Sequence, residues 1–330
     1  MKNILLLLFL FFSAGVVAQG SLNIVSISDF KTSDGAVIKN CKIGYRTVGK
    51  LNAGRSNIIL WPSWFTGTSQ GILNIVPKII DTTQFYVVLA DALGDGISSS
   101  PSNTKNFPAL TIRDMVNSQY VLLTQYLNIQ HVFAVGGISM GAMQTLEWMI
   151  AYPTFMDRVI SIVGTPRQSF HDLLLWNIEA NTISDAEKNG DKDKIVLAMK
   201  KVIAIHLMEL YTPDYFIRTL KADSLNRYLD NFYARQKFTI SDWLIQLRAM
   251  IKHDIYKSSG KDDVAIKALI KAKVLIMVAA RDQMVSPKSA IDLSKQIECS
   301  LVSFDNDCGH NLFDCGTEKV REIVGSFLHE

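Results

Sequence analysis

The sequence predicts an α/β fold in which a mostly parallel, doubly wound sheet carries a helical insertion. Continuous apolar runs bounded by turn residues recur along the chain, as is typical of strands that are covered on both faces. Segments with helical spacing of apolar residues alternate with these runs. The stretch 168–258 lacks such a run and has amphipathic helical periodicity instead. These three observations together predict the fold class.

The chain begins with the pattern of a secretory signal peptide over residues 1–18. Lys2 precedes an apolar run at 4–12, and small residues stand before Gln19. We therefore expect a secreted or periplasmic protein without stable membrane insertion after cleavage. An uncleaved anchor is the alternative, although Ser13 and Gly15 interrupt the run well before the ~20 apolar residues that a spanning helix needs.

Composition restricts the class of protein further. The chain has 330 residues, of which 48% are hydrophobic, enough for a large buried core. The formal net charge of +3 becomes +2 when Lys2 is removed with the signal, and no basic stripe is visible. Nucleic acid is therefore not an expected partner.

The elements are expected in the following order. Residues 22–27 and 37–45 alternate like half-buried strands around a turn at 33–35, which predicts an N-terminal hairpin. A helix is expected within 108–130, with Thr111 as its N-cap and Asp114 three residues later. Buried strands are expected at 57–61, 85–90, 131–135, 159–164, 274–280 and 301–304, and a C-terminal helix at 318–328.

The insertion divides the predicted core into 19–167 and 259–330. Within 168–258 we expect helices at 196–210 and 242–252, with a polar loop at 188–194. An insertion at the C-terminal edge of the sheet would overhang a site there as a lid. The alternative is a helical layer that packs on the sheet without contacting substrate.

One stretch, Gly137-Ile138-Ser139-Met140-Gly141, lies where the strand at 131–135 gives way to a helix at 143–150. This context is that of a nucleophile elbow, in which glycines two positions on either side of a serine permit a strained turn. The Met140 N–H would be the first oxyanion donor, and the helix that follows would direct its positive dipole end towards charge that develops near Ser139. The alternative is a glycine-rich turn that happens to contain a serine, because the pattern is short.

A serine needs a base and an acid, and both follow along the chain. Asp282 comes directly after the strand at 274–280, and His310 lies in the loop before the C-terminal helix. His310 would take the Ser139 proton while Asp282 orients the imidazole. Asp305 and Asp307 are rival acids because they are nearer to His310 in sequence, but the strand-tip position favours Asp282. We expect surface or capping roles for the remaining histidines, His131, His171, His206, His253 and His329.

The loop after the strand at 57–61 is expected to supply the second oxyanion donor, the backbone N–H of Phe65 or Thr66. Trp64 and Phe65 would then contact substrate, unless they are only core aromatics. Four cysteines, Cys41, Cys299, Cys308 and Cys315, allow three pairings, and the spacing favours none. Cys308 and Cys315 flank His310, but a zinc site there lacks further ligands, so we expect no metal and no cofactor.

A long block of the chain resembles the homoserine O-acetyltransferases of the α/β-hydrolase superfamily. The block covers 107–116, 136–144 and 146–148, and weaker matches extend it over nearly the whole chain after the signal. The resemblance implies Ser139 as nucleophile, Asp282 as acid and His310 as base, in agreement with the reasoning above.

The sequence departs from that family where the family binds its amino-acid substrate. Asn311 replaces the usual aspartate after the catalytic histidine, and residues 63–67 differ from the family's oxyanion loop. Where the family presents an arginine and a tyrosine, an ungapped comparison finds Val202 and Glu209. If the helix register differs, the carboxylate contact would come instead from Lys200, Lys201 or Arg248.

We therefore expect an enzyme that acts on a small-molecule ester or acyl substrate, most simply an exported ester hydrolase with an acyl-Ser139 intermediate. Trp64, Phe65 and the lid would contact this substrate. One alternative is an O-acyltransferase that uses acyl-CoA, in which Arg248 would contact the carboxylate of the amino-acid substrate. Another is a non-catalytic binding protein on the same fold. The acyl group, the acceptor and the oligomeric state, a homodimer included, are left open.

Overall fold

A computed structural model describes residues 20–236, 238–261 and 265–330; the predicted signal peptide, 1–18, lies outside these ranges. Its strands are β1 (Asn23–Ser26), β2 (Phe30–Lys31), β3 (Val37–Ile38), β4 (Lys42–Val48), β5 (Ile58–Pro62), β6 (Tyr86–Ala90), β7 (Val132–Ile138), β8 (Met156–Ile162), β9 (Lys273–Ala279) and β10 (Ser300–Phe304). Eight strands form one sheet in the order β1-β4-β6-β5-β7-β8-β9-β10. Strands β5 to β10 pair in parallel, whereas β4 is antiparallel to both of its neighbours. The predicted mostly parallel sheet is confirmed.

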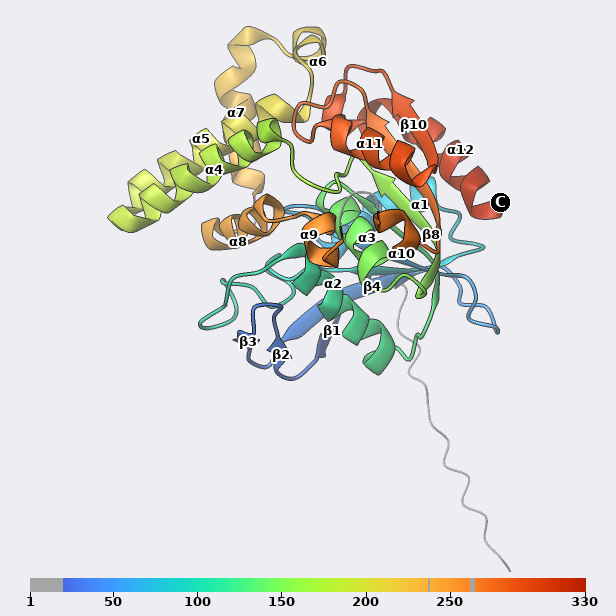
Figure 1. Ribbon diagram of the computed structural model, residues 1–330. Helices are drawn as coiled ribbons and strands as arrows, with labels where there is room; N and C mark the ends of the chain where they lie inside the picture. Colours follow the sequence, from blue (N-terminus) through green and yellow to red (C-terminus); the bar gives the residue numbers. More distant parts are fainter. Residues whose placement is uncertain (1–19, 237, 262–264) are drawn as a thin grey trace, which may run out of the picture.

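Two hydrophobic cores cover the two faces of this sheet. The helices of the α/β part are α1 (Ser69–Ile79), α2 (Ile112–Val121), the π-helix η1 (Leu122–Tyr126), α3 (Met140–Ala151), α9 (Ile255–Ser259), α10 (Ile266–Leu269), α11 (Pro287–Ile297), the 3₁₀ turn η3 (Gly309–Asn311) and α12 (Phe313–His329). On one face α1 packs against α12, and their apolar residues join one core with β5 and β9. On the other face α2, α3 and α11 contribute to the second core. Figure 1 shows the two helical layers around the sheet.

The N-terminal hairpin differs from the prediction in one respect. Strand β1 pairs with β4, but the turn at 33–35 joins β2 to β3 in a separate two-stranded ribbon. Asn40 adopts a positive φ of 48° and breaks the expected strand 37–45 into β3 and β4. An asparagine tolerates this left-handed conformation better than most residues, so it marks the break.

A helical insertion, residues 170–251, separates β8 from β9. It contains α4 (Phe170–Asn189), α5 (Lys192–Leu210), α6 (Pro213–Thr219), the 3₁₀ turn η2 (Ala222–Ser224), α7 (Leu225–Arg235) and α8 (Ile240–Ile251). Helices α5 and α8 lie where helices are expected, whereas α4, α6 and α7 were not predicted. Only Gly190, at φ 65°, and the N-cap Asp191 separate α4 from α5, so the polar loop is shorter than expected.

The insertion projects from one side of the α/β part, with α4 and α5 running side by side (Figure 1). No helix in the described ranges is long and apolar enough to cross a membrane. The exact boundaries between core and insertion, predicted at 167/168 and 258/259, stay a prediction.

Candidate active site

Ser139 stands alone at the junction of β7 and α3, with φ 56° and ψ −122°. This conformation is strained for a residue with a Cβ. Two glycines make the turn possible, since a Cβ on Gly137 would lie 2.2 Å from the Gly141 carbonyl oxygen. A Cβ on Gly141 would lie 2.7 Å from the Pro62 carbonyl oxygen. The tight approach of these backbones places the Ser139 side chain at the carboxyl edge of the sheet.

Ser139, His310 and Asp282 form one hydrogen-bonded chain. His310 Nε2 lies 2.8 Å from Ser139 Oγ, and His310 Nδ1 lies 2.7 Å from Asp282 Oδ2. The other carboxylate oxygen, Oδ1, accepts the backbone N–H groups of Met284 and Val285 at 3.0 and 2.9 Å. Asp282 and His310 are buried, and Ser139 is half-buried. A buried carboxylate fixed in this way holds the Nδ1–H tautomer, which leaves Nε2 free to accept the serine proton.

The rival acids are engaged elsewhere. Asp307 makes a bidentate ion pair with Arg218 at 2.8 and 3.0 Å, and hydrogen bonding to that guanidinium lowers the pKa of the Asp307 carboxyl. Asp305 is exposed. Of the three acids considered, the structure brings only Asp282 to the imidazole of His310.

Two backbone N–H groups, those of Met140 and Phe65, have the character of oxyanion donors. Met140 is the first residue of α3, so its N–H has no intrahelical partner. The N–H groups of Met140 and Phe65 donate to no acceptor within the described part of the chain. Thr66 corrects the prediction, because its N–H donates to Gln246 Oε1 at 3.1 Å and is therefore occupied. Phe65 remains the candidate for the second donor.

The three residues predicted to bind substrate lie in different settings. The buried Phe65 ring packs against Trp243 and His206, with ring centroids 4.9 and 5.5 Å away. Trp64 is half-buried, and its ring lies against Gly67, two residues before α1. Arg248 is exposed on α8, and its guanidinium donates to Ser184 Oγ of α4 at 3.0 Å. Its role in substrate binding stays a prediction.

A buried polar cluster within the insertion escaped the sequence reasoning. Glu179, with no exposed surface, lies 3.1 Å from His206 Nδ1 and 3.3 Å from Trp243 Nε1. His206 is thus buried, as is His253, and neither has the expected surface or capping role. The spacing of apolar residues could have indicated that Glu179 is buried, because it lies four residues after Leu175 and four before Ile183 on the apolar face of α4.

The loop that carries His310 is closed by a disulfide between Cys308 and Cys315. This bond joins two of the four cysteines, and it removes both sulfurs from the zinc site considered above. Cys41 and Cys299 are free, and burial raises the pKa of their thiols to about 12 and about 11. Both are therefore unreactive thiols at neutral pH.

Residues of the insertion that follow α5 form hydrogen bonds with the loop that carries His310. Tyr211 donates to Asp314 Oδ2 at 2.6 Å, and Thr212 Oγ1 donates to the Asp307 carbonyl oxygen at 2.6 Å. With the Arg218–Asp307 pair, these bonds join the segment after α5 to both ends of the His310 loop.

The fold and the site define a class of protein, and comparison with known proteins agrees. The model of the alpha/beta hydrolase fold family matches residues 65–317, so the chain belongs to the α/β-hydrolase fold family. An ethyl acetate hydrolase of Pseudomonas veronii is 28% identical over 329 residues, covering 92% of this chain and 94% of that protein. A solved structure of the acetyl esterase MekB has a TM-score of 0.85 at 26% identity, covering 94% of this chain and 98% of the other.

The predicted resemblance to homoserine O-acetyltransferases is also confirmed. The homoserine O-acetyltransferase of Methanococcoides burtonii is 27% identical over 368 residues, covering 96% of this chain and 74% of that protein. The chain is accordingly an enzyme of the ester hydrolase or acyltransferase type.

Proposed function

We propose that this enzyme is an exported ester hydrolase that acts through an acyl-Ser139 intermediate. The observation that carries the proposal is the hydrogen-bonded chain from Ser139 Oγ through His310 to Asp282, with distances of 2.8 and 2.7 Å. A weak hydroxyl nucleophile becomes reactive when a neutral imidazole accepts its proton during attack.

The reaction follows from this geometry in two half-reactions. Ser139 Oγ attacks the acyl carbon while its proton passes to His310 Nε2, and the N–H groups of Met140 and Phe65 receive the negative oxygen. The C–O bond to the alcohol then breaks, and the alcohol leaves with the proton from His310. Water repeats these steps on the acyl-Ser139 ester and releases the acid. Asp282 stabilises the imidazolium in both halves.

Water is the proposed acceptor because, in the described part of the chain, the residues considered as contacts for an amino-acid substrate are neutral or paired with other side chains. A bound homoserine carboxylate needs an opposite charge to offset its desolvation. Val202 is fully buried, and Asn311 is neutral. Lys200 pairs with Asp230 at 3.0 Å, and Arg248 faces Ser184. The name of the Pseudomonas veronii relative supports hydrolysis.

An O-acyltransferase that uses acyl-CoA is the second candidate, favoured by the relatives named homoserine O-acetyltransferases. The test compares p-nitrophenyl acetate hydrolysis with CoA release from acetyl-CoA plus homoserine, with Ser139→Ala as the blank for both. We expect saturable ester cleavage and no homoserine-dependent CoA release. CoA release that saturates with homoserine, with negligible ester cleavage, would make the enzyme a transferase. Inactivity of folded protein in both assays would support a binding protein.

Export is part of the proposal and rests on the composition of residues 1–18. The disulfide between Cys308 and Cys315 supports it, because such bonds persist in oxidising compartments. Intact-mass measurement on native material tests it: a chain starting near Gln19 is expected, and a retained Met1 would indicate an anchor.

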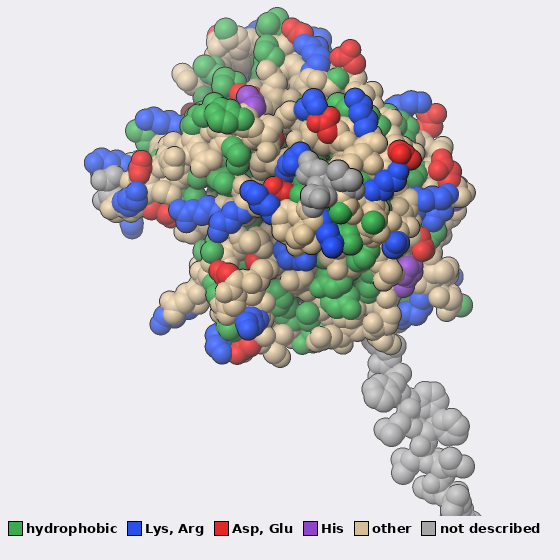
Figure 2. Space-filling model, viewed as in Figure 1, with side chains coloured by type: hydrophobic (Ala, Val, Ile, Leu, Met, Phe, Trp, Pro, Cys, Tyr) green, Lys and Arg blue, Asp and Glu red, His purple; other side chains and the backbone are tan. Residues whose placement is uncertain are grey.

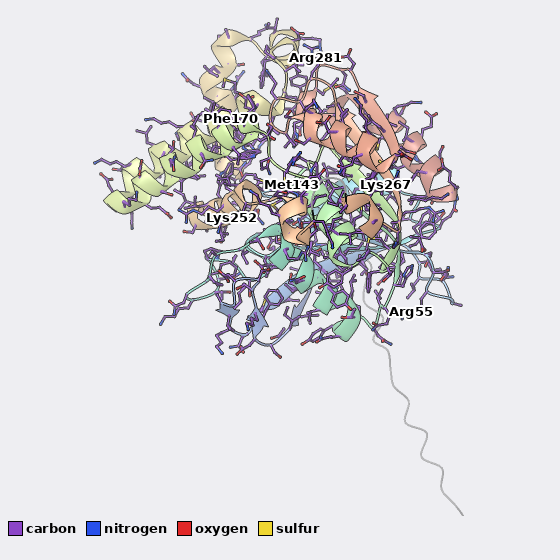
Figure 3. All side chains as sticks on the ribbon, viewed as in Figure 1. Arg55, Met143, Phe170, Lys252, Lys267 and Arg281 are labelled. Carbon is purple, nitrogen blue, oxygen red and sulfur yellow. A yellow bond between two sulfur atoms is a disulfide. The ribbon has the colours of Figure 1, made fainter. Side chains whose placement is uncertain are left out.

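The proposal also includes a homodimer formed through the insertion. Phe170, Leu174 and Ile178 follow one another at four-residue spacing on α4 and are 83%, 52% and 44% exposed. Hydrophobic side chains gather over this part of the surface (Figure 2), and Figure 3 labels Phe170 beside the ribbons of α4 and α5. An exposed apolar stripe of this kind is typical of an association surface. Light scattering should give a dimer mass, and Leu174→Glu should give a monomer.

A further inference from the structure

A fully buried glutamine of the insertion touches the oxyanion loop, residues 63–67. Gln246 on α8 has no exposed surface, and its Oε1 accepts the Thr66 N–H at 3.1 Å. Its Nε2 donates to the Leu93 carbonyl oxygen at 3.4 Å. Both ends of the amide are thus engaged, which fixes its orientation between the insertion and the core.

The loop needs such support because its backbone is strained. Thr66 has a φ of 58°, in the left-handed region that residues with a branched Cβ avoid. A strained residue keeps its conformation only when its surroundings hold it there. The Thr66 N–H belongs to the Phe65–Thr66 peptide, which is joined at the Phe65 Cα to the peptide that carries the Phe65 N–H. A relaxation of Thr66 would therefore reach the Phe65 N–H through that carbon.

A second glutamine holds the other end of the loop. Gln144 on α3 donates from Nε2 to the Ser63 carbonyl oxygen at 2.9 Å, and Gln119 donates to Gln144 Oε1 at 2.6 Å. The Phe65 N–H therefore lies between one contact from the elbow helix and one from the insertion. Trp243, three residues before Gln246 on the same helix, also packs edge-on against the Phe65 ring.

We propose that Gln246 is a positioning residue for the oxyanion hole, so that α8 of the insertion is part of the machinery that stabilises the transition state. The inference rests on the proposed hydrolase function. The Gln246 oxygen accepts the Thr66 N–H and thereby keeps the Phe65 N–H where negative charge develops on the substrate oxygen. Binding of the ground-state ester does not depend on it.

The test uses two substitutions that separate the acceptor oxygen from side-chain volume. Gln246→Met keeps the length of the side chain and removes the acceptor, whereas Gln246→Glu keeps an oxygen facing the Thr66 N–H. Gln168→Met is the matched control, because Gln168 Nε2 donates to the Met250 carbonyl oxygen of the same helix at 2.9 Å without touching the loop. Kinetics of p-nitrophenyl acetate hydrolysis and Tm are measured for all of them.

We expect kcat to fall about tenfold or more in Gln246→Met with KM unchanged, since loss of an oxyanion donor costs about 10²–10³ in kcat. Gln246→Glu should keep most of kcat, and Gln168→Met should match the wild type. Equal kcat in Gln246→Met and wild type would overturn the inference, as would an equal loss in Gln246→Met and Gln246→Glu. If Gln246→Met does not fold, the Glu variant decides alone, because a loss of kcat there at wild-type Tm contradicts the proposal. Inactive wild-type enzyme would instead refute the proposed function.

Discussion

Cys308 is bonded to Cys315, and the loop that this disulfide closes carries His310. Cys308 is buried directly beside the site, while the far end of the loop, at Cys315, is exposed. The imidazole is therefore held by a covalent closure as well as by its hydrogen bond to Asp282. We therefore expect the activity of the site to depend on the redox state of this disulfide.

Reduction of the disulfide should weaken both the fold and the site. A closed loop of this length is expected to contribute ~2.5 kcal/mol by restricting the unfolded chain. The double variant Cys308→Ser/Cys315→Ser should therefore show a lower Tm, and a lower kcat because His310 is less well held. Thermal unfolding and ester hydrolysis check this, with Cys299→Ser as the control. Wild-type kcat in the double variant would show that the disulfide is only structural.

Asp282→Asn should reduce kcat by about 10⁴-fold. The Asn oxygen would accept the N–H groups of Met284 and Val285, so its NH₂ would face His310 Nδ1 and stabilise the wrong tautomer. Steady-state kinetics measures the loss, and the exposed Asp305→Asn serves as the control. A large loss in the control with little loss in Asp282→Asn would reassign the acid.

We expect the buried carboxyl of Asp95 to make the stability of the fold depend on pH. Burial, and then the neighbouring charge of Asp91, raise the pKa of Asp95 well above its ordinary value of 3.8. A carboxyl with a raised pKa in the folded state contributes stability that is present below 3.8 and lost as the pH rises through the raised value.

Asp95→Asn should remove this loss of stability, because an amide does not ionise. Its oxygen can still accept the N–H groups of Ile97 and Ser98. The variant should have a higher Tm than the wild type at neutral and alkaline pH. The difference should shrink as the pH falls towards 4, close to the ordinary value. Thermal unfolding across this range checks it, and a difference independent of pH would contradict the account.

The sequence was informative where the signal is local. The apolar runs at 57–61 and 85–90, and the glycines around Ser139, each depend on neighbouring residues, so they predicted β5, β6 and the elbow. The position of Asp282 at the end of a strand was likewise predictable from the apolar run that precedes it in the sequence.

The contacts between distant segments were not predictable in this way. Gln246 and Thr66 are 180 residues apart, and only the packing of α8 over the loop brings them together. Arg248 is exposed although its neighbour Leu247 is buried, and the sequence did not show on which face of α8 it would lie. A charged residue near a predicted site does not by itself show whether its side chain faces the site or the solvent.

The central claim is that Ser139 itself carries the acyl group during turnover. The most direct measurement is rapid acid quenching of the enzyme with p-nitrophenyl acetate, followed by mass spectrometry of the peptide that contains Ser139. We predict one added acetyl group on Ser139, which disappears when substrate is exhausted and is absent in Ser139→Ala. Turnover without acetylation of Ser139, or acetylation that persists in Ser139→Ala with undiminished turnover, would contradict the account.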